Sequence, residues 1–233
     1  MSKKRLAIIP ARGGSKRIPG KNKRSFLGKP IIAYSIEIAI RSGLFDEVMV
    51  STDDEEIAAI AVEYGARVPF FRSVEKAGDY ATLTDVLIEV VQEYESRGEV
   101  FDTLCCLLAT APLLAIDDLK AGYAALAEGG FDSACAVVPF SYPILRALDL
   151  ADDGILSMRW PEYAFTRSQD LKTAYHDTGT FYWIKRDTLL SEKKLFTAKG
   201  TAIVLDERSI QDIDTETDWL LAELKYKLKF PSP

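Results

Sequence analysis

Residues 6–23 read LAIIPARGGSKRIPGKNK, a short apolar run followed directly by a loop rich in glycine, lysine and arginine. The run from Leu6 to Pro10 has the length and composition of a buried strand. In parallel α/β sheets, ligands bind beyond the carboxyl ends of the strands, which is where this loop must lie. The stretch therefore predicts an α/β fold with an anion-binding loop at the ligand edge of its sheet.

The loop favours a triphosphate over other anions. Glycines let backbone N–H groups approach an anion closely, and the cations supply charge. The pattern is not a Walker A motif, because Ser15 stands where glycine is required and Asn22 replaces the Ser/Thr, and it contains no Gly-x-Gly-x-x-Gly. A solvated basic loop is the alternative interpretation. The glycines and cations are Gly13, Gly14, Gly20, Arg12, Lys16, Arg17, Lys21 and Lys23.

Strand and helix patterns alternate over the first two thirds of the chain. The clearest period lies in residues 83–94, where apolar side chains recur on one helix face. Strands separated by helices predict an α/β fold, in which a mostly parallel sheet carries helices on both faces. We expect helices at 30–41, 53–64, 83–94, 116–127 and 215–229, and strands at 47–52, 103–108, 133–138 and 201–205.

Composition narrows the class of protein. The 233 residues fit a single domain, 1–233, and a net charge of −6 argues against a nucleic-acid partner. Three cysteines and one histidine offer no disulfide framework and no zinc spacing, which favours a reducing cytoplasm. No long apolar run predicts a membrane span. Within the domain, turn residues and short β-like pieces predict a β-rich inserted segment at about 140–183.

A pair of aspartates near the carboxyl terminus is a candidate metal site. Residues 211–219 read QDIDTETDW, and on extended backbone Asp212 and Asp214 would point the same way. Two carboxylates suit Mg²⁺, which prefers oxygen ligands. The alternative is that Asp214 or Thr215 only caps the last helix. Because a triphosphate loop is also predicted, we favour metal binding as the role of Asp212 and Asp214.

These motifs together resemble the CMP-sugar synthetases, the cytidylyltransferases that activate sialic acid and related nonulosonic acids. The resemblance implies a Rossmann-like (GT-A-like) α/β fold, CTP as the nucleotide, an acidic nine-carbon sugar and Mg²⁺. It also implies a homodimer in which an arm, at about 140–169 here, completes the partner's site. The motifs that carry it are ARGGSKRIPGKN at 11–22, STDDEEIA at 51–58, Arg72, TAPL at 110–113 and QDIDTETDW at 211–219.

The resemblance also implies a set of site residues. Arg12, Lys16 and Lys21 would stabilise the triphosphate and the leaving pyrophosphate during catalysis, and Asp212 would join them. Asp212 and Asp214 match the family's metal aspartates, and the general base stays open between Asp212 and a metal-bound hydroxide. Nucleotide binding is assigned to Ala11, Arg12, Gly13, Gly14, Ser15, Lys16, Lys21, Asn22, Arg72 and Thr82.

Three segments resemble the branch of the family that activates pseudaminic acid. They are ATAP at 109–112, where the sialic-acid branch has QPTSP, RSQD at 167–170, and YHDTGTFYW at 175–183. The expected reaction is therefore CTP plus pseudaminic acid giving CMP-pseudaminic acid and pyrophosphate. One departure is Ser73, which stands after Arg72 where the family usually has proline.

The sugar would be held by side chains from these segments. Arg167 could bind the sugar carboxylate bidentately, or could form a surface or interface ion pair instead. His176 or Asp177 could orient the sugar, against the alternative of a satisfied structural histidine. Tyr182 and Trp183 are assigned to the core. The substrate-binding residues expected are Thr110, Arg167, His176, Asp177 and Gly179.

Other functions remain as alternatives. A related enzyme could activate sialic acid, legionaminic acid or the eight-carbon sugar Kdo. A non-catalytic nucleotide-binding protein would not need the aspartate pair. A glycosyltransferase usually carries its Asp-x-Asp near the centre of the sheet, whereas we expect Asp212 and Asp214 on the extreme C-terminal strand.

Overall fold

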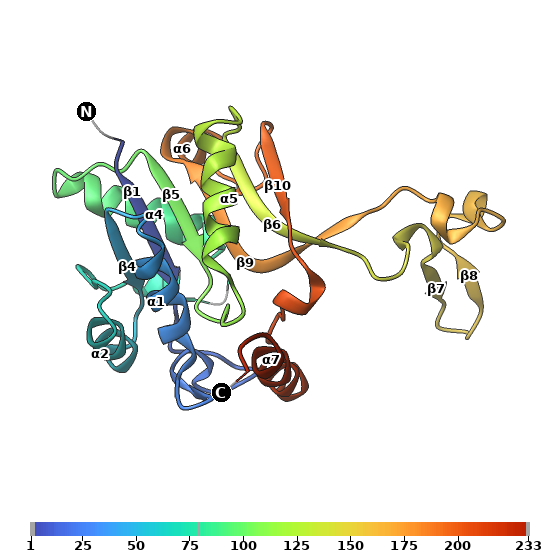
Figure 1. Cartoon of the computed structure of the whole chain (residues 1–233), viewed down its shortest axis with the longest axis horizontal. Helices are drawn as coiled ribbons and strands as arrows, with labels where there is room; N and C mark the ends of the chain where they lie inside the picture. The colour runs from blue at the N-terminus through green and yellow to red at the C-terminus, as the bar shows by residue number, and fades with distance from the viewer. Residues whose placement is uncertain (1–2, 79, 232–233) are drawn as a thin grey trace.

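The computed structural model describes residues 3–78 and 80–231 of the chain. Its centre is a six-stranded sheet with the order β10-β6-β9-β5-β1-β4 (Figure 1). Strands β4, β1 and β5 are parallel neighbours, as are β6 and β10, while β9 pairs antiparallel with both β5 and β6. The strands are β1 (Arg5–Pro10), β4 (Glu47–Ser51), β5 (Thr103–Leu107), β6 (Ser133–Pro139), β9 (Tyr175–Lys185) and β10 (Gly200–Val204).

The predicted α/β fold with a mostly parallel sheet is confirmed, and β9 supplies its antiparallel element. Residues 175–183, which the sequence places in the β-rich segment, form most of this central strand. Residues 180–184 are all buried, as expected for a strand covered on both faces. The insertion that leaves the body is therefore residues 140–174.

Helices cover both faces of the sheet. Figure 1 shows α5 in front of the sheet, with α4 and α6 on the far side. Alternate residues of each central strand enter opposite cores: Phe181 packs with the α1, α2 and α5 side, and Tyr182 with the α4 and α6 side. The helices are α1 (Ile31–Ser42), α2 (Glu55–Glu63), α3 (Val74–Ala77), α4 (Leu83–Ser96), α5 (Ile116–Ala127), α6 (Arg186–Glu192) and α7 (Glu216–Lys229).

Two of the sequence predictions about packing are confirmed directly. The period in residues 83–94 corresponds to α4, which buries Val86, Leu87, Val90, Val91 and Tyr94. Likewise Tyr182 and Trp183 are core residues with 5% and 0% exposure.

A third, smaller core attaches α7 beside the loop that follows β1. Phe26 packs edge-on against Tyr34 of α1 and Trp219 of α7, with ring centroids 5.4 and 5.5 Å apart. Ile18 and Ile213 are buried in the same cluster. This packing brings residues 211–215, which precede α7, next to the basic loop. The cluster also includes the short hairpin of β2 (Ser25–Phe26) and β3 (Lys29–Pro30).

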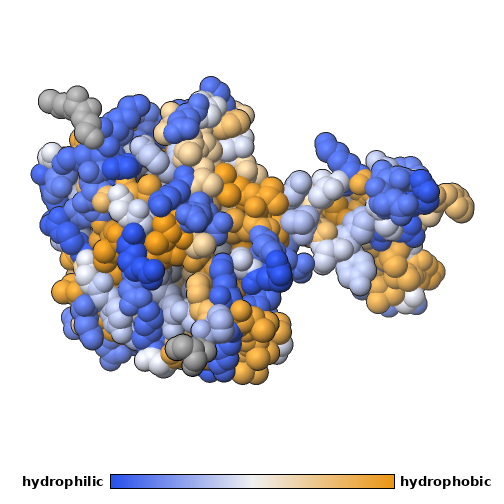
Figure 2. Space-filling view, in the orientation of Figure 1, coloured by the Kyte–Doolittle hydropathy of each residue, from blue (hydrophilic) through white to orange (hydrophobic). Residues whose placement is uncertain are grey.

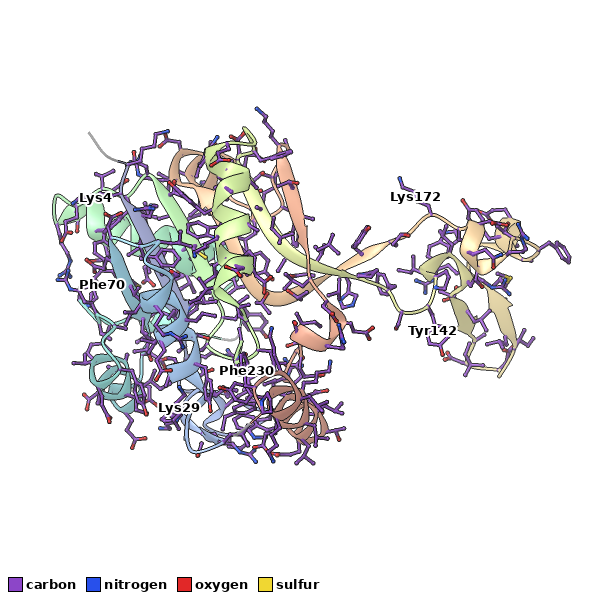
Figure 3. All side chains as sticks on the ribbon, viewed as in Figure 1. Lys4, Lys29, Phe70, Tyr142, Lys172 and Phe230 are labelled. Atoms are coloured by element: carbon purple, nitrogen blue, oxygen red, sulfur yellow. The ribbon has the colours of Figure 1, made fainter. Side chains whose placement is uncertain are left out.

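Residues 140–174 form an arm that projects from the body (Figure 1). Tyr142 and Lys172 lie on it, away from the body (Figure 3). Its regular structure is limited to one antiparallel hairpin and short 3-10 turns. Among the described residues, no helix has the length and apolar character needed to cross a bilayer. The arm's elements are β7 (Leu148–Leu150), β8 (Leu156–Met158), and turns η2 (Ile144–Arg146), η3 (Pro161–Tyr163) and η4 (Ser168–Asp170).

Candidate active site

A cleft of about 260 Å³ opens at the carboxyl ends of β1 and β5. One wall is the basic loop, and the other is the segment from Arg72 into the start of α4. Four cations of the loop and two of the opposite wall line the cleft. This concentration of positive charge suits a highly negative ligand such as a triphosphate. The polar residues that line the cleft include Arg12, Ser15, Lys16, Arg17, Lys21, Asn22, Arg72, Lys76, Thr82 and Thr110.

The loop is held from below by the segment that follows β4. The backbone N–H of Gly13 donates to Oδ1 of Asp53 at 3.0 Å. A Cβ atom on Gly13 would lie 2.7 Å from Oδ2 of Asp54, so only glycine fits there. Asp54 also caps α2 and accepts from Lys23 Nζ at 3.2 Å. The motif STDD thus supports the phosphate loop, a role that its sequence alone did not reveal.

The second half of the loop turns back on itself. Asn22, 8% exposed, donates through Nδ2 to the carbonyl of Arg12 at 3.0 Å. Gly20 adopts a φ of 63° immediately before the turn η1 (Lys21–Lys23), a left-handed conformation that glycine adopts without strain. These contacts fold the second half of the loop into a turn, and the loop cations Arg12, Lys16, Arg17 and Lys21 line the cleft.

Arg72 is a buried cation on the opposite wall, 7% exposed. Its Nε donates to Oγ of Ser51 at 3.0 Å, and its Nη2 donates to the Ser51 carbonyl at 2.5 Å. Desolvation lowers the pKa of the guanidinium, while the charges of Asp53 and Glu89 oppose that shift. An arginine bound this rigidly at the end of β4 is preorganised to contact an anion in the cleft.

The residues after Arg72 close the same wall. Ser73 caps α3 by accepting from Lys76 N–H, and its own N–H donates to Glu89 at 3.1 Å, a bond that proline could not make. Thr82 caps α4 in a reciprocal capping box with Asp85. Thr82 therefore lines the cleft with its hydroxyl already engaged. Lys76 also lines the cleft, and nothing in the local sequence distinguishes it from an ordinary surface lysine.

The aspartate pair lies in a loop, not in the C-terminal strand that the sequence suggested, because β10 ends at Val204. Burial nevertheless alternates along this loop: Ile213 is fully buried, whereas Asp212 is exposed and Asp214 is half-buried. Asp214 is bound by Arg17, whose Nη1 lies 2.5 Å from Oδ2, and Lys21 Nζ lies 3.6 Å from Oδ1. Lys21 also donates to the Ile213 carbonyl.

The start of α7 is capped by residues other than the pair. Thr215 accepts from the N–H of Asp218, and Asp218 accepts from the N–H groups of Asp214 and Thr215. Glu216 pairs with Arg24 at 2.6 Å. Capping of α7 therefore uses neither the carboxylate of Asp212 nor that of Asp214.

The donor set at the pair suits Mg²⁺. The pKa of Asp212 is raised, first by partial desolvation of its carboxyl and then by the negative charge of Asp214. A divalent cation would relieve the repulsion between the two carboxylates. Among residues 3–78 and 80–231, no group of three or more His, Cys, Asp or Glu side chains is arranged around a common point. Asp212 and Asp214 are the two carboxylates that would hold Mg²⁺, with substrate phosphates and water as its other oxygen ligands.

The expected sugar-binding residues fall in two places. Asp177 accepts from the hydroxyl of Tyr182 and from the N–H of Gly179, so its carboxylate is already engaged. His176 is exposed, and its ring lies 4.9 Å from that of Phe140. Oδ1 of Asp212 lies 4.0 Å from the position of a Cβ on Gly179, so this strand end adjoins the aspartate pair.

Arg167 lies on the arm, where it pairs with Asp170 at 2.7 Å. A single chain does not bring it to the cleft. The remaining departures concern the loop: Ala11 is buried with its N–H bonded to Ser51, and neither Gly13 nor Gly14 lines the cleft. The structure does bring together Arg12, Ser15, Lys16, Lys21, Asn22, Arg72, Thr82 and Thr110.

Comparison with known proteins agrees with this geometry. A family model described as Cytidylyltransferase matches residues 6–208. The chain belongs to the cytidylyltransferase family. Among relatives of this cytidylyltransferase, the pseudaminic acid cytidylyltransferase of Campylobacter jejuni subsp. jejuni serotype O:2 is 44% identical over 229 residues, covering 98% of this chain and 99% of the relative. The CMP-N,N'-diacetyllegionaminic acid synthase of Legionella pneumophila is 32% identical, covering 94% of each chain.

Solved structures share the fold at lower identity. A CMP:2-keto-3-deoxy-manno-octonic acid synthetase complexed with CTP superposes with a TM-score of 0.68 at 20% identity, covering 97% of this cytidylyltransferase and 98% of that chain. A 4-diphosphocytidyl-2C-methyl-D-erythritol synthase from Anaerococcus prevotii gives 0.65 at 14% identity, with 97% and 99% covered. These likenesses confirm the Rossmann-like nucleotidyltransferase fold.

Proposed function

We propose that this cytidylyltransferase joins CMP to pseudaminic acid, consuming CTP and releasing pyrophosphate. The observation that carries the proposal is the cleft at the sheet's carboxyl edge, where loop cations and Arg72 face one another beside the aspartate pair. The 44% identity to a pseudaminic acid cytidylyltransferase over nearly the whole of both chains supports the sugar. Three free cysteines support a reducing, cytoplasmic location.

The protein's part in the reaction is to position and stabilise charge. The anomeric hydroxyl of the sugar gives up its proton and attacks the α-phosphorus of CTP. The bond from that phosphorus to the oxygen that bridges it to the β-phosphate breaks in line, and pyrophosphate leaves. Arg12, Lys16 and Lys21 bind the triphosphate and stabilise the negative charge that grows on the departing pyrophosphate. Arg72 holds the nucleotide from the opposite wall, and Asn22 keeps the loop in place through the carbonyl of Arg12.

Asp212 and Asp214 would hold Mg²⁺, which, when bound, neutralises phosphate charge and polarises the reacting oxygens. His176 and Gly179, in the first half of β9, would place the sugar on the side of the cleft nearest Asp212. Thr110 lines the cleft after β5 and would contact the same substrate.

We also propose that the functional unit is a homodimer. The arm exposes large apolar side chains, such as Leu150 at 71% and Phe165 at 101%. Leu224 and Leu228 of α7 are likewise 57% and 84% exposed. Figure 2 shows hydrophobic residues gathered at the far end of the arm and near α7. Contiguous exposed apolar surface of this kind favours a protein partner, and Arg167 could then reach the site of a second copy.

The reaction is tested by incubating the purified protein with CTP, Mg²⁺ and pseudaminic acid, and identifying the product by mass spectrometry. We expect a CMP-linked sugar and one pyrophosphate per product. Asp212→Ala should abolish turnover while its circular dichroism spectrum stays like that of the wild type. A variant with near-normal turnover would remove Asp212 from the mechanism.

A further inference from the structure

Arg17 and Asp214 connect the two halves of the site. Nη1 of Arg17 lies 2.5 Å from Oδ2 of Asp214, and Nζ of Lys21 lies 3.6 Å from Oδ1. Arg17 also lines the cleft. A carboxylate assigned to the metal is therefore bound by two cations from the loop assigned to the triphosphate.

The metal and the loop cations compete for the carboxylate of Asp214, and Asp214 and the triphosphate compete for Arg17 and Lys21. A carboxylate paired with Arg17 and facing Lys21 attracts a divalent cation weakly, because two positive charges already lie beside it. A triphosphate in the cleft offers Arg17 a stronger partner, since guanidinium binds phosphate oxygens bidentately. The side chain of Arg17 is 68% exposed and that of Asp214 31%, so the arginine has room to change partner with little repacking.

We propose that Arg17 is a positioning residue that exchanges partners: it holds Asp214 in the free enzyme and moves to the phosphates when CTP binds, which releases Asp214 for the metal. This inference rests on the metal role of Asp212 and Asp214 in the proposed function. The metal site is then weak in the free enzyme and is completed by the nucleotide. Because such coupling is reciprocal, the metal strengthens nucleotide binding by the same factor.

The test uses Mn²⁺ alone, without nucleotide, titrated into the full-length protein while the electron paramagnetic resonance signal of free Mn²⁺ is recorded. Arg17→Gln removes the charge that occupies Asp214. We expect this variant to bind Mn²⁺ roughly threefold to tenfold more tightly than the wild type. Arg17→Lys, which keeps the charge, should retain wild-type affinity.

Arg24→Gln is the matched control, because it removes the same charge from the same stretch of chain but from a pair with Glu216. Its Mn²⁺ affinity should change less than about twofold, the scale of a surface charge at a distance. Adding Asp214→Asn to Arg17→Gln should remove the gain.

The proposal is overturned if Arg17→Gln binds Mn²⁺ no better than the wild type, if Arg24→Gln gains equally, or if the gain survives Asp214→Asn. Failure of the proposed function is a separate result: CTP and pseudaminic acid would then yield no pyrophosphate, whatever the Mn²⁺ titration gives.

Discussion

Gly13 and Asp54 lie so close together that a Cβ atom on the glycine would stand 2.7 Å from Oδ2 of the aspartate. The N–H of Gly13 is bonded to Asp53 at 3.0 Å, so two consecutive acids after β4 fix the first turn of the loop. The position of the triphosphate site therefore depends on contacts made outside the cleft.

Gly13→Ala should displace the loop, because the new methyl group must push against Asp54. We expect KM for CTP to rise about tenfold or more, as misplaced contacts to a reacting group cost rate and affinity. Gly14→Ala is the control, since among the described residues nothing beyond its two chain neighbours lies within 4 Å of its Cβ position. Steady-state kinetics that show equal effects for both variants would contradict this account of the loop.

Arg72→Met should remove most CTP binding measured by calorimetry. The variant loses a cation that two bonds to Ser51 hold in a fixed orientation. Arg72→Lys keeps the charge but cannot make both bonds, and should raise KM for CTP about tenfold. Arg67→Met, which removes an exposed arginine paired with Glu47, should bind CTP like the wild type. Normal CTP binding by Arg72→Met would exclude this arginine from the site.

Thr215→Ala should lower the free energy of unfolding by about 1 kcal/mol in urea titrations, because it removes the N-cap of α7. Thr217→Ala, one residue into the helix and exposed, should change stability much less. Since residues 211–215 carry the aspartate pair, we also expect Thr215→Ala to need more Mg²⁺ for half-maximal rate. Equal stability losses in both variants would refute the capping role.

The cysteines should resist alkylation in the folded protein. Burial raises the pKa of Cys106 to about 12 and of Cys135 to about 11, and also raises that of Cys105. Because the thiolate is the reactive form, a raised pKa leaves little of it at pH 8. Mass spectrometry after iodoacetamide should find slow labelling until urea unfolds the chain. Rapid labelling of Cys105 under native conditions would be incompatible with its burial.

Mixed subunits test the arm. If Arg167 serves the partner's site, Arg167→Ala and Asp212→Ala should each be inactive alone. Refolding them together should restore about a quarter of wild-type activity, since half of the random dimers would hold one intact site of two. Mixtures that stay inactive would place Arg167 outside the partner's site.

The sequence was sufficient for features that depend on local pattern. The apolar run before Ala11 and the helical period of α4 helped to predict the α/β fold. The glycines and cations that follow the run predicted the phosphate loop. Contacts between distant segments were not predictable: the antiparallel place of β9 depends on strand pairing across the insertion, and the bond between Gly13 and Asp53 joins separate loops. In the sequence, Arg17 is one of five cations in the loop, and nothing in the neighbouring residues indicates that it pairs with Asp214.

The central claim is best tested by measuring pyrophosphate release from CTP and Mg²⁺ with pseudaminic acid and, separately, with sialic acid. Our account predicts release with pseudaminic acid and a kcat/KM for sialic acid lower by about a hundredfold or more, as expected when polar groups of a sugar site are left unpaired. Equal or faster release with sialic acid would keep the reaction but contradict the sugar assignment. No release with either sugar, from protein that binds CTP, would contradict the proposed activity itself.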